Sequence, residues 1–152
     1  MKSKNILFAD DDADLRNFMK EVFQEVSEVI KTDLIITEAT NGAEAIQLFD
    51  QSIQQEKPFD IVVTDYMMPV ATGLQVIKHV IKTHPVPIIV ISAYNKADDI
   101  DFIKEGALLF ISKPFTMKQI TDALSDAVSI ILVKEDIEKA EKIIKILEKL
   151  TS

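Results

Sequence analysis

The chain has 152 residues, 47% of them hydrophobic, which fits one globular domain with its own core and leaves no room for a second full domain. It contains no cysteine, so disulfides, a thiol nucleophile and thiolate metal sites are excluded. The net charge is −8, and because residues 134–149 hold equal numbers of lysines and acids, the rest of the chain carries the whole excess. Such an acidic body repels phosphate backbones, so direct binding to nucleic acid is not expected.

Neither a membrane span nor a secretory signal is expected. No apolar stretch approaches the length of a transmembrane helix. The basic start, Met1 to Lys4, is separated from Asp10 by only the short run Asn5 to Ala9, which is too short for the apolar part of a signal peptide. We therefore expect a cytoplasmic protein that does not bind membranes.

Short apolar runs with β-branched residues predict five buried strands, at Ile6–Ala9, Leu34–Ala39, Ile61–Thr64, Val86–Ser92 and Ala107–Ile111. A stretch of helical period follows each run, and we expect the fourth helix to end at Gly106. Strands of this kind alternating with helices predict an α/β fold, with a parallel sheet covered by helices on both faces. Sites in such folds form beyond the carboxyl ends of the strands.

After Pro114 there is neither Gly nor Pro, so one long helix or two abutting helices are expected from about Thr116 to the end. A helix that covers a sheet needs only about a dozen residues. We therefore divide the chain into a domain at residues 1–127 and a helical extension at residues 128–152. Spacings of three and four, the period of a two-helix seam, relate six residues of the extension: Ile130, Val133, Ile137, Ala140, Ile144 and Leu147. Dimerisation, docking on the body and a connection to an absent output domain all remain open.

Three acids are expected at one edge of the sheet. Asp10 and Asp11 follow the first strand, and Asp65 ends the third. Carboxylates brought together repel one another, and a divalent cation held by oxygen ligands is the usual reason to tolerate that repulsion. Asp12 and Asp14 fit a simpler role at the start of a helix, where acids interact favourably with the helix dipole.

Several separated motifs make residues 4–127 resemble the receiver domain of two-component response regulators. They occur in the family's order: Asp10-Asp11, Asp65 with Met67, Met68, Pro69 and Gly73, Ser92-Ala93, Gly106-Ala107 with Phe110, and Lys113-Pro114-Phe115. The resemblance implies a flavodoxin-like, doubly wound five-stranded parallel sheet of strand order 2-1-3-4-5. It also implies phosphorelay signalling, without an enzymatic activity beyond the protein's own phosphorylation and dephosphorylation.

The resemblance implies that Asp65 is the phosphoacceptor, supplied by a sensor histidine kinase or a histidine phosphotransfer protein. It implies Mg2+ as the cofactor, bound by the side chains of Asp11 and Asp65 and the backbone carbonyl of Met67, with Asp10 acting through water. The metal is needed because a carboxylate is a poor nucleophile toward an anionic phosphoryl group. Lys113 would lie near the phosphoryl oxygens, and its bond to the following proline would be cis, as in the family.

The resemblance also implies a switch. The Ser92 hydroxyl would bond the phosphoryl group, and Phe110 would then turn inward. This would change a surface that we call the switch face, made by the helix before Gly106, the fifth strand and the helix that begins near Thr116. An unknown downstream protein would read that change, and a homodimer could form through the switch face or the C-terminal helix.

One departure, one expectation about dephosphorylation and two alternatives accompany this interpretation. The family often has Asp-Gly where this chain has Thr72-Gly73, which we expect to alter only a loop. Met67 and Tyr94 are bulky positions that flank the path of an attacking water, so we expect slow self-dephosphorylation. One alternative is a phosphohydrolase of the haloacid dehalogenase type using Asp10 and Asp12, although no late acidic metal motif or cap is visible. A degenerate receiver that acts as a scaffold disagrees with the intact set of acids, serine and lysine.

Overall fold

The structure is a computed structural model and describes residues 2–93 and 101–152. The described elements are β1 (Ser3–Ala9), α1 (Ala13–Ile30), β2 (Asp33–Ala39), α2 (Gly42–Gln54), β3 (Ile61–Thr64), α3 (Gly73–Thr83), β4 (Ile88–Ser92), β5 (Leu109–Ser112) and α4 (Met117–Thr151). All strand pairs are parallel, and the sheet order is β2-β1-β3-β4-β5. The flavodoxin-like fold class and the strand order are therefore confirmed.

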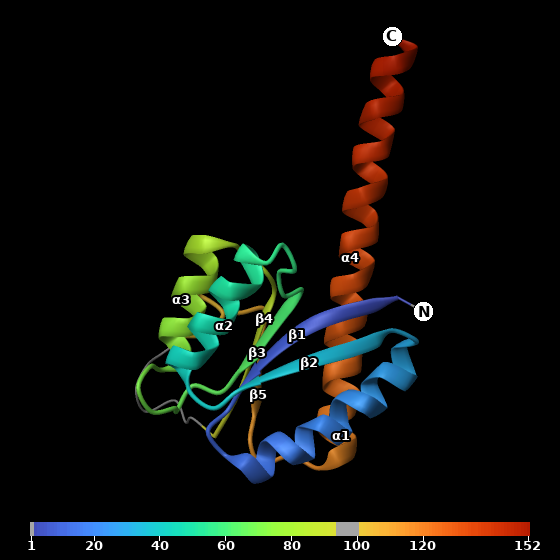
Figure 1. The fold of residues 1–152 in the computed structure, drawn as a ribbon. Coiled ribbons are helices and arrows are strands. Elements are labelled where there is room, and N and C mark those ends of the chain that lie inside the picture. The colour runs from blue at the N-terminus through green and yellow to red at the C-terminus, as the bar shows by residue number, and fades with distance from the viewer. Residues whose placement is uncertain (1, 94–100) are drawn as a thin grey trace.

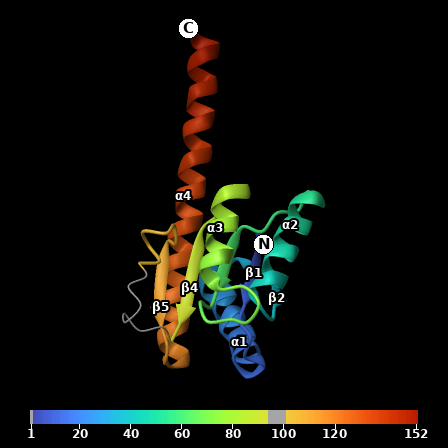
Figure 2. The same ribbon diagram turned by 90° about the vertical axis from the view of Figure 1, so that its left-hand side faces the viewer.

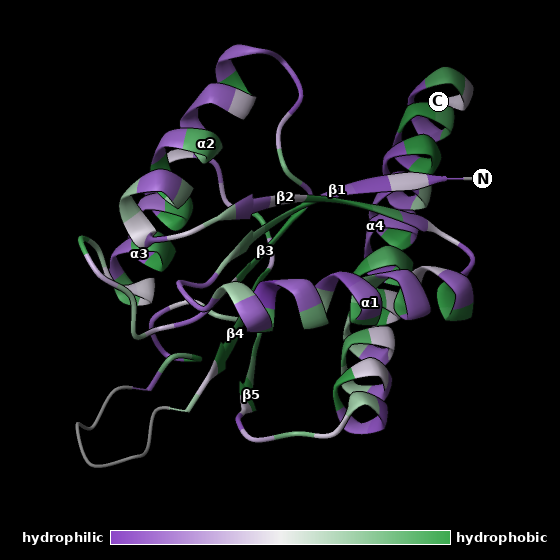
Figure 3. Ribbon diagram, turned by 60° about the horizontal axis from the view of Figure 1, so that its bottom comes forward, coloured by the Kyte–Doolittle hydropathy of each residue, from purple (hydrophilic) through white to green (hydrophobic). Residues whose placement is uncertain are grey.

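Helices cover both faces of the sheet (Figure 1). Alternate residues of β1 point to opposite faces, so Ile6 and Phe8 join the core beneath α1 and α4, whereas Leu7 and Ala9 join the core beneath α2 and α3. Every residue of β3 and β4 is buried, as the continuous apolar runs predicted. Figure 3 shows these central strands as hydrophobic, with hydrophilic residues on the outer surfaces of the helices around them.

The predicted fourth helix differs from the structure over the residues that can be compared. Residues 101–106 form turns, and residues 94–100 lie outside the described part of the chain. The side chain of Asp101 accepts hydrogen bonds from the backbone N–H groups of Ile103 and Lys104, as at the start of a helix, but only about one turn follows before Gly106. Gly106 then adopts a φ of 117°, which side chains disfavour, and it ends these turns, where the sequence had predicted that it ends a helix.

The C-terminal region is one continuous helix, α4, which settles the choice between one helix and two. Thr116 caps its start, and Gln119 completes a capping box. The first half packs on the body through Ile120, Leu124, Val128 and other buried residues, the last of which is Ile131. From residue 136 onward every residue is exposed, and Figures 1 and 2 show this part projecting from the body. No helix in the described ranges is long and apolar enough to cross a membrane.

Candidate functional site

The three predicted acids meet at the carboxyl edge of the sheet. Asp10 follows β1 and Asp65 follows β3, and these strands are paired so that Ala9 lies opposite Thr64. The backbone N–H of Asp65 donates to the carbonyl of Ala9 (2.9 Å), which continues the ladder to the site. Asp10, Asp11 and Asp65 each offer a carboxylate oxygen, and these atoms lie within 4.8 Å of one another. The parallel pairing of the two strands therefore creates the cluster.

Two of the acids are buried and held by backbone groups. Oδ1 of Asp10 accepts from the N–H of Asp12 (2.9 Å), and Oδ1 of Asp65 accepts from the N–H groups of Tyr66 (2.7 Å) and Met67 (3.3 Å). Asp11 is exposed at the rim. Burial raises the pKa of Asp10, and the negative charge of Asp65 adds to this, against the opposing effects of the Asp12 N–H and of Lys113.

Lys113 joins the two buried acids. Its Nζ lies 3.1 Å from Oδ2 of Asp10 and 3.0 Å from Oδ2 of Asp65. Lys113 follows β5, its N–H donates to the carbonyl of Ser92 (2.9 Å), and its bond to Pro114 is cis as expected. Burial lowers the pKa of the Lys113 amine, but the charges and hydrogen bonds of the two carboxylates outweigh it, so the pKa is raised. The lysine is therefore a fixed cation between the two acids.

The donor atoms of the cluster suit a hard divalent cation. All three side-chain ligands are carboxylate oxygens, the type that Mg2+ prefers. With the acids ionised, three negative charges and one positive charge leave −2 at the site, which one divalent ion would neutralise. The exposed Asp11 gives an ion access from solvent. Asp10, Asp11 and Asp65 therefore fit a Mg2+ ion, and Met67 lies beside them through its bond to Asp65.

The predicted switch residues lie on the two strands beyond β3. Ser92 is the last residue of β4 and is fully buried. Phe110 in β5 is partly buried, and its ring stacks on that of Phe102, with centroids 5.3 Å apart. Phe102 in turn meets Tyr66 edge to face at 5.2 Å. Because Tyr66 directly follows Asp65, this aromatic series connects the neighbour of Asp65 with Phe110.

The sequence alone did not reveal the aromatic series. Tyr66 was visible only as the neighbour of Asp65, and Phe102 fell within a segment predicted to be helical, where its direction could not be inferred. Tyr94, which we expected to flank the water path, lies outside the described residues. Met67, its counterpart, has a side chain that is 62% exposed.

Two other sequence expectations gain a structural explanation. Asp12 is the N-cap of α1, and its Oδ1 accepts from the N–H groups of Asp14 (2.9 Å) and Leu15 (3.3 Å). It therefore has the helix-start role, and nothing favours the haloacid dehalogenase alternative that pairs it with Asp10. Thr72 is the N-cap of α3 and forms a capping box with Gln75. Threonine thus supplies a cap where the family often has aspartate.

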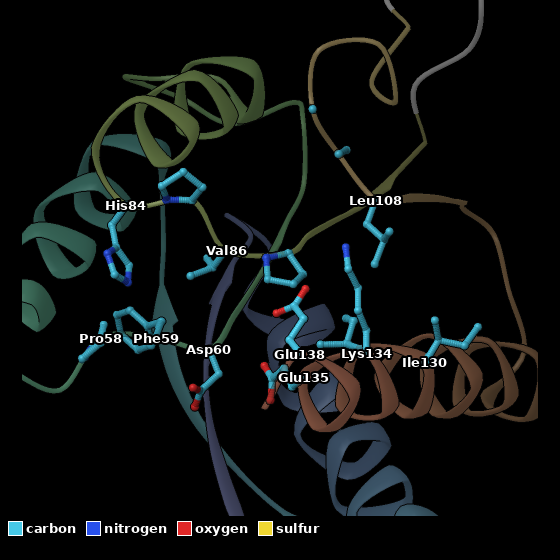
Figure 4. Close-up of a pocket in the computed structure, with 15 residues that line it drawn as sticks. Pro58, Phe59, Asp60, His84, Val86, Leu108, Ile130, Lys134, Glu135 and Glu138 are labelled. Atoms are coloured by element: carbon cyan, nitrogen blue, oxygen red, sulfur yellow. The ribbon is translucent and has the colours of Figure 1, made fainter. Parts of the chain in front are cut away.

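A pocket of about 590 Å³ lies at the other end of the sheet. Phe59, Val86 and Leu108, which line it, precede β3, β4 and β5, so the pocket is at the amino ends of these strands. α4 supplies its remaining wall (Figure 4) with Ile130, Ile131, Lys134, Glu135 and Glu138. The pocket is therefore separate from the acid cluster and marks the place where α4 leaves the body.

Comparisons with known proteins point to one family. The chemotaxis protein CheY of Thermotoga maritima is 36% identical over 124 residues, which are 80% of this chain and 95% of that protein. The response regulator TrrA of Thermotoga maritima, solved in complex with Mg2+-BeF, superimposes with a TM-score of 0.66 at 28% identity and covers 84% of this chain and 98% of its own. The receiver domain of the Francisella response regulator 1452 gives a TM-score of 0.68 at 28% identity, with coverages of 87% and 98%.

Some other curated relatives are longer proteins, of which this chain spans 32% to 43%. What these relatives share with this chain is therefore one domain, and its extent is given by the sequence model of the response regulator receiver domain, which matches residues 6–125. That range contains β1 to β5, the acid cluster and Lys113. The chain belongs to the response regulator receiver domain family of two-component systems.

Proposed function

We propose that this protein is a phosphorylation-operated switch in which Asp65 accepts the phosphoryl group and Mg2+ is the required cofactor. The observation that carries the proposal is the position of Lys113 Nζ between Oδ2 of Asp10 and Oδ2 of Asp65, beside the three-acid cluster. A lone lysine between two buried acids neutralises only part of their charge. The remainder suits a cation and, with it, an anionic phosphoryl group.

In this proposal each polar group has a separate task. Asp65 attacks the phosphorus through one carboxylate oxygen as the bond from phosphorus to the donor's histidine nitrogen breaks and the imidazole leaves, while the N–H groups of Tyr66 and Met67 hold the orientation of Asp65. The ammonium of Lys113 stabilises charge on the phosphoryl oxygens. Asp11, Asp65 and the carbonyl of Met67 would hold Mg2+ directly and Asp10 would hold it through water. The bound ion would neutralise charge during transfer.

The response to phosphorylation is proposed to pass through Ser92 and Phe110. Ser92 ends β4 next to the site, and its hydroxyl would bond a phosphoryl oxygen. Phe110 is only partly buried and stacks on Phe102 at the margin of the core, so less packing opposes a turn of its ring than at a fully buried position. An inward turn of Phe110 would break that stack and change the switch face, a local event that biases a packing equilibrium.

The partners proposed for this switch are a phosphodonor and a reader. The donor would be a sensor histidine kinase or a histidine phosphotransfer protein, and the reader a protein that recognises the switch face in the cytoplasm. Residues 1–127 would act as the receiver and residues 128–152 as a helical extension without catalytic output. The relative TrrA, solved with Mg2+-BeF, supports the use of a metal and a phosphoryl group at such a site.

The test is phosphorylation of the purified chain by acetyl phosphate, followed by intact mass. We expect one added phosphoryl group in the presence of Mg2+, none in EDTA and none in Asp65→Asn. Asp12→Asn is the control, because Asp12 caps α1 and should leave the transfer intact. A chain that still gains the group after Asp65→Asn but loses it after Asp10→Asn would refute the assignment of Asp65.

A further inference from the structure

An exposed apolar stripe runs along α4 from Ile130, beside the pocket, into the projecting part of the helix. Five of the six residues at alternating spacings of three and four are more than half exposed: Ile130, Val133, Ile137, Ile144 and Leu147. Ala140, the sixth, is also exposed. Figure 3 shows hydrophobic residues along the projecting helix. Burial of large aliphatic side chains stabilises a protein, and an exposed row of them marks a contact surface. The stripe therefore indicates that a binding partner is missing.

The stripe lies on the side of α4 that faces away from the body. In a heptad assignment, Ile130, Ile137 and Ile144 occupy a positions and Val133, Ala140 and Leu147 occupy d positions. Val128 and Glu135 then fall at f, on the opposite side of the helix. Val128 is buried in the core, and Glu135 accepts a hydrogen bond from Lys4 Nζ (2.9 Å). The body therefore covers the f side and leaves the a and d side open along its length.

The spacings within the stripe, three, four, three, four and three residues, are the same in both directions. If two copies of α4 lie antiparallel, the a positions of one meet the d positions of the other. The same register then pairs Ile130 with Leu147 of the second copy, Val133 with Ile144, and Ile137 with Ala140. Each layer combines residues of the stripe alone, and no stripe residue is left without an apolar partner. The two bodies then lie at opposite ends of the paired segment.

The charged residues beside the stripe favour antiparallel pairing of two copies of α4 over parallel pairing. In the antiparallel register, the e residue Lys134 of each copy lies beside the e residue Glu141 of the other, which gives two attractive contacts. In a parallel pair, the g residue Asp136 instead lies beside Glu141 of the other copy, which gives two repulsive contacts. Within the described chain neither Lys134 nor Glu141 has a salt-bridge partner, so both are available to a second copy.

We propose that the occupant of this face is a second copy of the chain, paired antiparallel through residues 130–147 of α4. The apolar g residues Ile143 and Leu150 flank the seam and widen it, while Ile146, at a c position, stays outside it. The pairing spans fewer than three heptads, so we expect a dimer that dissociates on dilution. It goes beyond the proposed phosphoryl transfer and does not depend on Asp65, so Asp65→Asn should dimerise as the wild type does.

Because the chain has no cysteine, introducing one cysteine per chain can show whether the two helices pair parallel or antiparallel. Val133→Cys and Ile144→Cys chains are mixed in equal amounts and oxidised mildly. Both substitutions are on the exposed stripe and should not disturb the fold. We expect the mixed disulfide dimer to dominate, because Val133 meets Ile144 of the other copy. A dominant Ile144→Cys homodimer would instead show parallel pairing and overturn the proposal.

A charge change gives a second, independent test by light scattering over a range of protein concentrations. Glu141→Lys should weaken the dimer about tenfold, because it places Lys134 beside a second lysine, and the Lys134→Glu, Glu141→Lys double variant should recover the affinity. In a parallel dimer the same Glu141→Lys change would strengthen pairing by relieving Asp136. A wild-type chain that stays monomeric at every concentration, or a tighter dimer in Glu141→Lys, would refute the antiparallel pairing.

Discussion

Removing the Lys113 ammonium should destabilise the protein strongly when no metal is present. Asp10 and Asp65 are both buried, and the lysine is within 3.1 Å of each. In Lys113→Met the apolar stem is kept, but the charge of the cluster changes from −2 to −3 if all three acids are ionised. Losing one partner of a buried ion pair costs about 3–5 kcal/mol, because the remaining charge is left uncompensated.

The lower end of that range applies here, because the Lys113 side chain is 20% exposed and solvent screens its charge. About 3 kcal/mol corresponds to a fall in Tm of about 6–12 °C for a chain of this size. Mg2+ binds the folded cluster and not the unfolded chain, so it should raise the Tm of both proteins. The rise should be larger in Lys113→Met, since that cluster carries one more negative charge.

The assay is thermal unfolding followed by circular dichroism, in EDTA and in excess Mg2+. Lys118→Met is the matched control, because Lys118 also lies close to an acid, 2.7 Å from Asp122, but on the surface. We expect no measurable change in that variant. Equal unfolding temperatures for the wild type and Lys113→Met in EDTA would refute the reasoning, and so would a Mg2+-induced rise that is no larger in the variant.

Three further predictions concern the loops and the base of α4. Gly73→Ala should cost about 3 kcal/mol in urea unfolding and slow phosphorylation, because a Cβ there would lie 2.2 Å from the carbonyl oxygen of Asp65; full stability would contradict this. Thr72→Ala should lose about 1 kcal/mol through the missing cap, whereas Thr72→Asp should retain it. The hydrogen bond from Lys4 to Glu135, opposed by partial burial, raises the pKa of Lys4. Its stabilising effect is therefore complete below the ordinary lysine pKa of about 10.4 and lost above the folded value, so alkaline unfolding should separate the wild type from Lys4→Met.

The sequence was sufficient to predict how the acids come together. β1 and β3 both contain short apolar runs that lead directly to the acids, so their carboxyl ends were clear, and parallel pairing brings Asp10 and Asp65 to the same edge. The placement of Lys113 followed from the family resemblance rather than from periodicity. Lys113 contacts both acids because of where β5 ends and how the chain continues beyond it. No local sequence pattern encodes that geometry.

The segment before β5 could not be predicted in the same way. Residues 101–106 have a composition compatible with a helix, and Asp101 caps their backbone as at a helix start, but the positive φ of Gly106 ends the segment after about one turn. Tertiary packing then turns Phe102 toward Tyr66 and Phe110. Contacts between aromatic rings far apart in the sequence leave no periodic signal, so this part of the site was visible only in the structure.

The unbroken course of α4 has a mechanical consequence. The helix begins three residues after Pro114 and continues for 35 residues, which at 1.5 Å per residue gives a rigid rod about 52 Å long. Because its first half is packed in the core, only the part from residue 136 onward, about 24 Å long, is free to swing. A tilt of about 5° where it leaves the body would move its far end by about 2 Å. Any change in how α4 packs on the body would therefore be enlarged at a point well outside the domain.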